Sequence, residues 1–215
     1  MIKAVIFDFD GVLVDSEKAN IEAAVATFKE LELPLSEVEI QSIPGRSSVD
    51  FIPLFLENRN IADSSVHRLV WEKNKDNYDK IWDEAVSLTP GVNQLISSLK
   101  ENGKVLAIAT TNRQVTVEKF FRKFGFRQSF SAIITGEDVT KRKPDPEVYL
   151  LVAQKLGVNT NEAIAVEDTE VGIKSAKAAG LKCIAVPNGY TKDDDFSEAD
   201  YIASSIMEVS KFVQN

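Results

Sequence analysis

Acidic side chains that directly follow short apolar segments are the residues best suited to chemistry. Asp8 and Asp10 follow the apolar segment 3–7, and Glu167 and Asp168 follow a similar segment later in the chain. Clustered carboxylates repel one another unless a cation lies among them, and oxygen ligands favour a hard ion such as Mg²⁺. An aspartate can attack phosphorus, and a second carboxyl group can protonate the leaving oxygen and then activate water. If the two segments meet in space, these residues predict metal-assisted phosphoryl transfer.

Two more polar groups occupy the same kind of position. Thr110 follows the apolar segment 105–109, and Lys143 lies in the loop after the segment 132–134. The ammonium group of Lys143, together with a metal, could offset the negative charge of a phosphate and of an attacking carboxylate. Bland alternatives remain open at this point. Thr110 could be an ordinary turn residue, Lys143 a solvated loop lysine and Glu167 a residue behind the metal ligands.

The apolar segments that precede these groups are predicted to be strands of one sheet. They are nearly continuous in apolar character, which is typical of parallel strands buried on both faces. The predicted strands are 3–7, 105–109, 132–134, 163–166, 183–186 and 201–203. Helical patterns bounded by proline or turn residues and by glycine predict helices at 92–101, 115–124, 147–156 and 171–179. This order predicts a doubly wound, Rossmann-like α/β fold with a parallel sheet, whose strand ends meet at one edge.

The stretch between the first two predicted strands is too long for a single crossover helix. Helical patterns at 17–31, 49–57 and 65–82 place apolar residues on one face of each segment. Residues 16–87 are therefore predicted to form an inserted all-helical cap domain, and residues 1–15 and 88–215 to form the α/β core. The alternative is that these helices belong to the helical layer of the core itself.

Composition excludes several other classes of protein. Hydrophobic residues make up 44% of the 215 residues, which is enough for a packed core, and the net charge is −8. Such a chain is a poor candidate for binding nucleic acid or an anionic membrane, and no obligate protein partner is evident. The single cysteine, Cys183, allows no intramolecular disulfide, and no secretory segment opens the chain, so we expect a cytoplasmic protein. The single histidine, His67, argues against a histidine-rich metal site.

Taken in order, four motifs resemble those of the haloacid dehalogenase superfamily. They are Asp8-Phe-Asp10-Gly-Val-Leu-Val-Asp15-Ser, then Thr110 after Ala-Ile-Ala, then Lys143-Pro-Asp-Pro-Glu-Val-Tyr, and finally Glu167-Asp168-Thr-Glu-Val-Gly-Ile. A helical cap between the first two strands is similar to the helical-cap branch of that superfamily. This branch contains β-phosphoglucomutase and many sugar-phosphate phosphatases. The resemblance covers the predicted core from end to end, and the four motifs together are highly specific.

The resemblance implies a role for each matched residue. Asp8 is implied to be the nucleophile and a metal ligand, and Asp10 the general acid and base, with its backbone carbonyl on Mg²⁺. Thr110 is implied to bind the transferring phosphoryl group, and Lys143 to hold that group and Asp8 together. Glu167 and Asp168 are implied to complete the metal site. Further candidates for substrate binding are Thr111, Asn112, Arg113, Asn20 and Arg46.

Several activities within and beyond this family remain open. Haloacid dehalogenases need neither a metal nor the second aspartate of the first motif, so Asp10 argues against dehalogenation. β-Phosphoglucomutases usually have a histidine at the position of Asn20 in this chain. They also usually have a Ser-Arg-Glu-Asp string in the cap, where this chain has Arg46-Ser47-Ser48-Val49-Asp50. Both differences argue against mutase activity. We therefore expect a Mg²⁺-dependent phosphatase that hydrolyses a small phosphorylated metabolite, such as a sugar phosphate, through an aspartyl-phosphate on Asp8. The alternatives are β-phosphoglucomutase and, more remotely, a non-enzymatic receiver domain that accepts phosphate.

Overall fold

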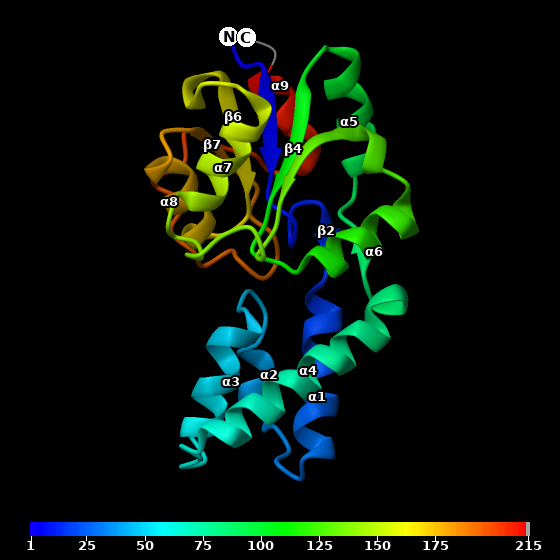
Figure 1. The fold of residues 1–215 in the computed structure, drawn as a ribbon, viewed down its shortest axis with the longest axis vertical. Coiled ribbons are helices and arrows are strands. Elements are labelled where there is room, and N and C mark those ends of the chain that lie inside the picture. The colour runs from blue at the N-terminus through cyan, green and yellow to red at the C-terminus, as the bar shows by residue number, and fades with distance from the viewer. Residues whose placement is uncertain (214–215) are drawn as a thin grey trace. The chain divides into compact units, whose positions relative to one another are not determined.

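The computed structural model describes residues 1–213, and a parallel six-stranded sheet forms the centre of the α/β part (Figure 1). The sheet order is β5-β4-β1-β6-β7-β8, and the paired strands are parallel throughout. The strands are β1 (Ala4–Phe7), β4 (Val105–Ala109), β5 (Phe130–Ile134), β6 (Ala163–Glu167), β7 (Lys182–Ala185) and β8 (Tyr201–Ile202). The predicted parallel α/β fold is confirmed.

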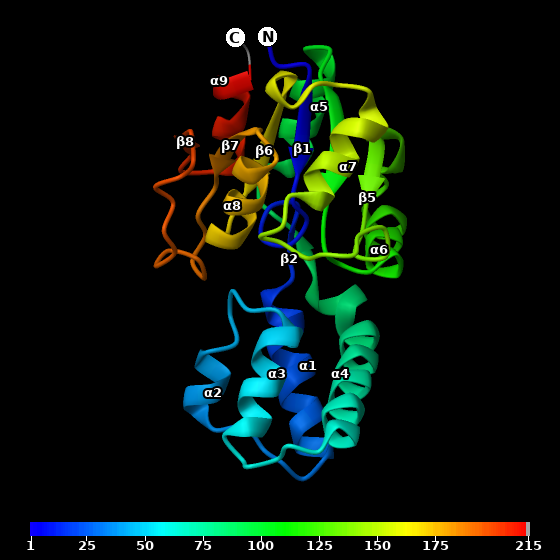
Figure 2. The same ribbon diagram turned by 60° about the vertical axis from the view of Figure 1, so that its left-hand side comes forward.

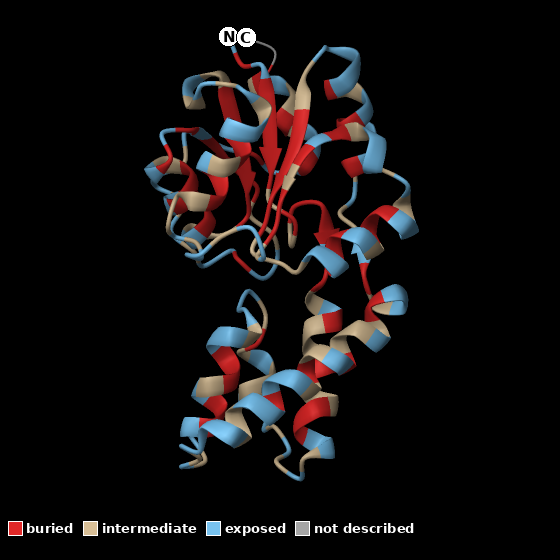
Figure 3. Ribbon diagram, in the orientation of Figure 1, coloured by how far each residue is buried: buried red, intermediate tan, exposed pale blue. Residues whose placement is uncertain are grey.

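The register of the central strands brings their carboxyl ends level with one another. Phe7 in β1 lies opposite Ile108 in β4 and opposite Val166 in β6. Asp8 then donates its backbone N–H to the carbonyl of Val166 at 2.9 Å. Burial on both faces explains the apolar sequences, and Figure 3 shows these strands coloured as buried along nearly their whole length. The residues that follow β1, β4 and β6 therefore meet at one edge of the sheet.

Helices cover both faces of this sheet (Figures 1 and 2). Helices α7 (Glu147–Leu156) and α8 (Glu170–Ala178) pack on one face. The other face is covered by α5 (Val92–Glu101), α6 (Gln114–Phe124) and the short α9 (Val209–Val213). The predicted ends of α5 and α7 coincide with the observed ones. Gly125 and Gly157 follow α6 and α7 with positive φ angles, and that conformation favours glycine over other residues.

The chain divides into two compact units, one made of Met1–Asp15 with the chain from Leu88 onward and one of Ser16–Ser87. The second unit contains α1 (Glu17–Glu30), α2 (Glu37–Gln41), α3 (Ser48–Glu57) and α4 (Ser64–Ala85). Helix α4 packs on α1 and α3, and an apolar cluster that includes Phe28, Phe51 and Phe55 forms a core within this unit. Helix α2 was not predicted, because its five residues are too few to show the helical spacing of apolar residues.

Short elements complete the described chain. Strands β2 (Val14–Asp15) and β3 (Ser87–Leu88) pair in a separate two-stranded sheet. Three single-turn 3₁₀ helices occur at Arg127–Ser129, Thr160–Glu162 and Ile206–Glu208. Among residues 1–213, no helix combines the length and the apolar character that crossing a bilayer requires.

Candidate active site

Three carboxylates meet at the carboxyl ends of β1 and β6. Asp8 follows β1, Glu167 is the last residue of β6, and Asp168 comes next. One ligand oxygen from each of the three residues lies within 4.8 Å of the others. Glu167 and Asp168 are buried, and Asp8 is mostly buried. The structure therefore brings together three of the acidic residues that the sequence placed at strand ends.

Lys143 reaches these carboxylates from the loop between β5 and α7. Its Nζ lies 2.6 Å from Asp8 Oδ1 and 2.6 Å from Glu167 Oε1, and it donates to the carbonyl of Ala109 at 3.1 Å. The side chain of Lys143 is 9% exposed, whereas that of Lys141 in the same loop is 71% exposed. Lys143 is thus a buried counter-charge, and the alternative of a solvated loop lysine does not hold.

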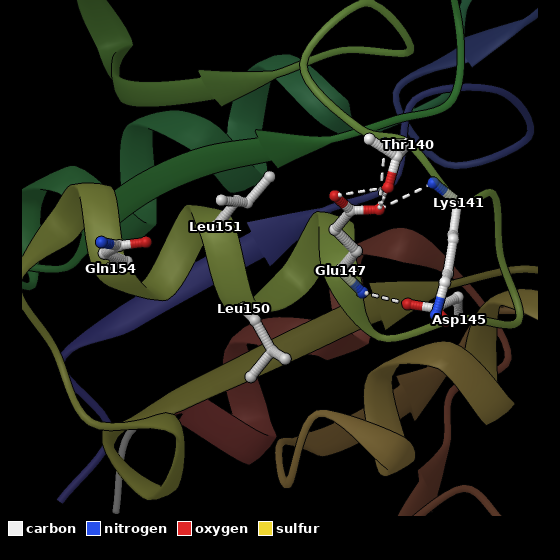
Figure 4. A pocket seen from close by; sticks show the side chains of 7 residues that line it. All are labelled: Thr140, Lys141, Asp145, Glu147, Leu150, Leu151 and Gln154. Carbon is white, nitrogen blue, oxygen red and sulfur yellow. Dashed lines mark hydrogen bonds and ion pairs between the residues drawn. The ribbon is translucent and has the colours of Figure 1, made fainter.

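The loop that carries Lys143 is held by Glu147, the first residue of α7. The Glu147 carboxylate accepts the backbone N–H of Thr140 at 3.0 Å and that of Lys141 at 2.7 Å, as Figure 4 shows. Asp145 in turn accepts the backbone N–H of Glu147 at 3.1 Å. A hollow of about 290 Å³ lies beside this turn. Its carboxylates are already paired and it contains none of the predicted catalytic residues, so we do not assign catalysis to it.

Tyr149, the last residue of the third motif, was given no role by the sequence analysis, and it is buried behind the lysine. Its hydroxyl donates to Glu167 Oε1 at 2.5 Å and lies 3.4 Å from Lys143 Nζ. The Lys143 ammonium also lies 5.0 Å from the centre of the Tyr149 ring. The motif does not say what this tyrosine contacts, and only the folded loop and helix bring its hydroxyl to Lys143 and Glu167. Tyr149 therefore fixes the position of both Glu167 and Lys143.

Burial and mutual repulsion perturb the titration of this cluster. Burial raises the pKa of Glu167 to about 7, although the nearby Lys143 ammonium opposes the rise. Burial also raises the pKa of Asp168 well above its usual range, and the charges of Asp8 and Glu167 add to the effect. For Lys143, burial disfavours the charged form, but the carboxylates of Asp8 and Glu167 outweigh it and hold its pKa above the ordinary value. When all are ionised, one ammonium group faces three carboxylates, so the cluster carries excess negative charge.

The same residues suit a divalent cation. Glu167 Oε2 and Asp168 Oδ1 are buried and have no hydrogen-bond partner among residues 1–213. Unpaired buried carboxylate oxygens are unfavourable unless a cation or water binds them. Two glycines allow the backbone to pack closely against these carboxylates. A Cβ on Gly11 would overlap the Asp168 carboxylate, and a Cβ on Gly172 would overlap the Glu167 carboxylate. An all-oxygen donor set of this kind fits Mg²⁺.

A second cluster of polar side chains surrounds Asp10. Asn112 Nδ2 donates to Asp10 Oδ2, and the backbone N–H of Asn112 donates to Thr110 Oγ1 at 3.0 Å. Thr110 is buried after β4, the strand that neighbours β1. The structure therefore places Thr110, Asn112 and Asp10 together, and a contact of Asn112 with substrate stays a prediction.

The remaining predicted substrate-binding residues occupy different places. Thr111 follows Thr110, and Arg113 is the N-cap residue of α6. Asn20 lies in α1, and Arg46 lies in the exposed loop before α3, so both belong to the second compact unit. Their contacts with substrate stay predictions.

Asn188, another residue that the sequence analysis missed, donates its Nδ2 to Asp168 Oδ2 at 2.9 Å. It follows β7, the strand beside β6, in the turn Pro187-Asn188-Gly189. The rule used for the other strands, that polar residues after a strand end gather at the site, would have found it. Asn188 comes two residues after the predicted strand 183–186.

Comparisons with known proteins agree with this geometry. The family model described as haloacid dehalogenase-like hydrolase matches residues 5–186. Protein CbbY of Cereibacter sphaeroides is 33% identical, covering 97% of this chain and 94% of the relative. A phosphorylated carbohydrates phosphatase of Thermotoga maritima is 31% identical, covering 85% of this chain and 84% of the relative.

Solved structures give the same result. Crystal structures of CbbY from Rhodobacter sphaeroides have a TM-score of 0.83 and 31% identity, covering 97% of this chain and 96% of theirs. One of them is a complex with phosphate, and another is a mutant in complex with xylulose-(1,5)bisphosphate. The chain therefore belongs to the haloacid dehalogenase-like hydrolases, and within them it is a phosphoric monoester hydrolase.

Proposed function

We propose that this protein is a Mg²⁺-dependent phosphatase that hydrolyses a small phosphorylated metabolite through an aspartyl-phosphate on Asp8. The observation that carries the proposal is the position of Lys143, whose ammonium joins Asp8 and Glu167 at 2.6 Å each, beside the buried Asp168. A mostly buried aspartate with a fixed counter-charge, in a carboxylate cluster that could hold a metal ion, is suited to attack a phosphate ester.

Two residues carry the covalent chemistry in this proposal. An Asp8 carboxylate oxygen attacks phosphorus, and the bond from phosphorus to the ester oxygen breaks as Asp10 donates a proton to that oxygen. Asp10 then takes a proton from water, and the water oxygen attacks phosphorus while the bond to Asp8 breaks. Asn112 holds the Asp10 carboxylate during both steps through its Nδ2–H.

The other residues bind the phosphoryl group and the metal ion in this proposal. We assign the binding of the phosphoryl oxygens to Lys143, whose Nζ lies 2.6 Å from Asp8 Oδ1, and to Thr110, which follows β4 beside β1. Asp8, Asp168, Glu167 and the backbone carbonyl of Asp10 would hold Mg²⁺. When bound, the ion supplies positive charge that stabilises the phosphoryl group and the attacking carboxylate.

Sugar phosphates are the substrate class that the relatives favour. The Thermotoga maritima relative is named a phosphorylated carbohydrates phosphatase, and CbbY was crystallised with xylulose-(1,5)bisphosphate. We propose that Thr111, Asn112, Arg113, Asn20 and Arg46 contribute to binding the remainder of such a substrate. The single cysteine, Cys183, is buried and unpaired, which suits the reducing cytoplasm that we propose as its location.

Phosphate release from a panel of phosphorylated sugars and other metabolites, with and without Mg²⁺, tests this function. We expect turnover only with the metal, and we expect Asp8→Asn to reduce kcat by at least about a thousandfold. Asp193→Asn, which changes an exposed aspartate, is the matched control and should retain activity. Full turnover by Asp8→Asn would show that the nucleophile is assigned wrongly.

The same panel distinguishes a phosphatase from a mutase. β-Glucose 1-phosphate is added, and both glucose 6-phosphate and free phosphate are measured over time. We expect phosphate release to be faster than isomerisation for every sugar in the panel. Isomerisation that outpaces phosphate release would assign the protein as a β-phosphoglucomutase instead.

A further inference from the structure

The side-chain amide of Asn188 has its orientation fixed by the loop that contains it. Asn188 Oδ1 accepts the backbone N–H of Tyr190 at 2.8 Å and that of Thr191 at 3.2 Å. The backbone N–H of Asn188 donates in turn to Thr191 Oγ1 at 3.2 Å, and Thr191 is buried. Because two N–H donors occupy the oxygen end of the amide, the opposite end must be the NH₂ group. That end faces Asp168.

This amide engages only one of the two Asp168 oxygens. Asn188 Nδ2 donates to Oδ2 at 2.9 Å, whereas Oδ1 is buried without a hydrogen-bond partner among residues 1–213. Gly11 packs against the same carboxylate with no side chain, since a Cβ there would overlap Oδ2. Asp168 is thus held at one oxygen, while the other is left for a different kind of partner. Among groups that suit an unpaired buried carboxylate oxygen beside two further carboxylates, a cation is the most favourable.

We infer that Asn188 is a positioning residue, which holds Asp168 so that Oδ1 is directed toward a divalent cation shared with Asp8 and Glu167. The inference rests on the proposed function, because it assigns a role at the same metal site. Hydrogen-bond partners behind metal ligands orient the ligands, and their removal typically weakens metal binding about 10- to 100-fold. Asn188 would therefore act on metal affinity and not on the chemical step itself.

Calorimetric titration of the full chain with Mg²⁺, without substrate, tests this role. The variant is Asn188→Ser, whose hydroxyl can still accept a backbone N–H of the turn but is too short to reach Asp168. We expect its Kd for Mg²⁺ to rise about 10- to 100-fold. Titration with Mn²⁺, followed by electron paramagnetic resonance, should show the same ratio. At saturating Mg²⁺, kcat should return to near the wild-type value, because only the position of a ligand has been loosened.

Two matched controls separate this role from a general effect on the loop or on the fold. Asn159→Ser makes the same change in an asparagine whose Nδ2 also donates to a carboxylate, that of Glu162 at 3.2 Å. That residue precedes β6, at the opposite end of the strand from Asp168. Thr191→Val removes the hydroxyl that accepts the N–H of Asn188 but leaves the amide facing Asp168. Both controls should bind Mg²⁺ like the wild type.

The outcomes separate the inference from the proposed function. If wild-type protein binds Mg²⁺ and Asn188→Ser binds it equally well, the inference is wrong and the proposed function stands. An equal loss in Thr191→Val would assign the effect to the loop and would also overturn the inference. If Asn188→Ser does not fold, Asn188→Thr replaces it, because its hydroxyl is an equivalent acceptor for the turn, with the same expected ratio. A wild-type protein that binds no divalent cation would overturn both the inference and the metal site.

Discussion

Lys143 supplies the positive charge that offsets two of the three clustered carboxylates, those of Asp8 and Glu167. Its ammonium is 2.6 Å from Asp8 Oδ1 and from Glu167 Oε1, and its third acceptor is the carbonyl of Ala109. Removing one partner of a buried ion pair leaves an uncompensated charge, which is far less favourable than losing an exposed pair. The same side chain is therefore expected to serve both the stability of the metal-free protein and catalysis.

We predict that Lys143→Met lowers the free energy of unfolding by about 3 kcal/mol in the absence of metal, and that it abolishes measurable phosphatase activity. Mg²⁺ should narrow the difference in stability, because the cation takes over part of the counter-charge. Denaturant unfolding with and without Mg²⁺ measures both effects. Lys141→Met removes an exposed ion pair with Asp145 from the same loop and should change stability by less than about 0.5 kcal/mol. Equal losses in the two variants would contradict this account of Lys143.

Tyr149 offers a finer test of the same cluster. Tyr149→Phe keeps the ring beside Lys143 but removes the hydroxyl that donates to Glu167. A hydrogen bond to a charged group is worth about 1.5 kcal/mol or more, so we expect kcat/KM to fall roughly tenfold. Tyr201→Phe is the control, because the ring of Tyr201 stacks on Phe212 and is not part of the carboxylate cluster. This variant should leave kcat/KM unchanged. Unchanged kcat/KM in Tyr149→Phe would show that the hydroxyl has no part in positioning the site.

At the scale of elements, α2 depends on an ion pair for its place in the helical unit. Arg59 donates to both oxygens of Glu39, to the carbonyl of Phe55 at 2.7 Å and to the carbonyl of Pro34 at 3.0 Å. Glu39 also closes a capping box with Ser36, the N-cap residue of α2. The bond from Arg59 lowers the pKa of Glu39 to about 2, against the opposing effect of burial. The charged form of Glu39 is therefore the one that stabilises the fold.

This pKa predicts how the stability of the protein depends on acid. Because the pKa is lower in the folded state, the contribution of Glu39 is complete above the ordinary value of 4.5 and is lost as the pH falls toward 2. Glu39→Gln should lower the free energy of unfolding by about 1 kcal/mol at pH 7, a value limited by solvent screening, and by less at pH 3. Denaturant unfolding at several pH values measures the trend. Glu37→Gln changes an exposed residue of the same helix and is the control. The prediction would be contradicted if the difference in unfolding free energy between Glu39→Gln and wild type did not change with pH.

The sequence predicted the elements well where local pattern and burial agree. The bounds of α5 and α7 follow from a flanking proline or turn and a closing glycine, and the strands follow from apolar segments that are buried on both faces. The positions of Asp8, Glu167 and Asp168 follow from strand order and register. The third motif ends on Tyr149, but the role of this residue could not be predicted, because its bond to Glu167 depends on how α7 packs on the sheet. Side-chain contacts of this kind leave no periodic signal in the sequence.

At the scale of the whole molecule, the two compact units have separate cores. The α/β unit holds Asp8, Lys143, Glu167 and Asp168 within a single body, and an apolar cluster around Phe28, Phe51 and Phe55 supports the helical unit. The chain has a net charge of −8, and the site itself is acidic, so an anionic substrate would be repelled without a cation. The net charge of the whole protein and the acidity of the site therefore both support the proposed dependence on Mg²⁺.

Chemical trapping shows whether Asp8 forms a covalent bond to phosphorus, the step on which the proposed phosphatase mechanism depends. The variant Asp10→Asn is mixed with 4-nitrophenyl phosphate and Mg²⁺, and the reaction is quenched in acid. The 4-nitrophenolate leaving group needs no proton from Asp10, so the protein can still be phosphorylated. Hydrolysis of the aspartyl-phosphate needs a base to activate water, and this variant lacks that base, so the phosphorylated protein should accumulate. Borohydride then reduces an aspartyl-phosphate to homoserine, which peptide mass spectrometry locates.

We predict homoserine at position 8 and at no other aspartate, in an amount that matches the burst of 4-nitrophenol. The double variant with Asp8→Asn should show neither the burst nor the reduced residue. Reduction at a different aspartate, or a burst of 4-nitrophenol with no reduced residue at position 8, would show that Asp8 is not the nucleophile.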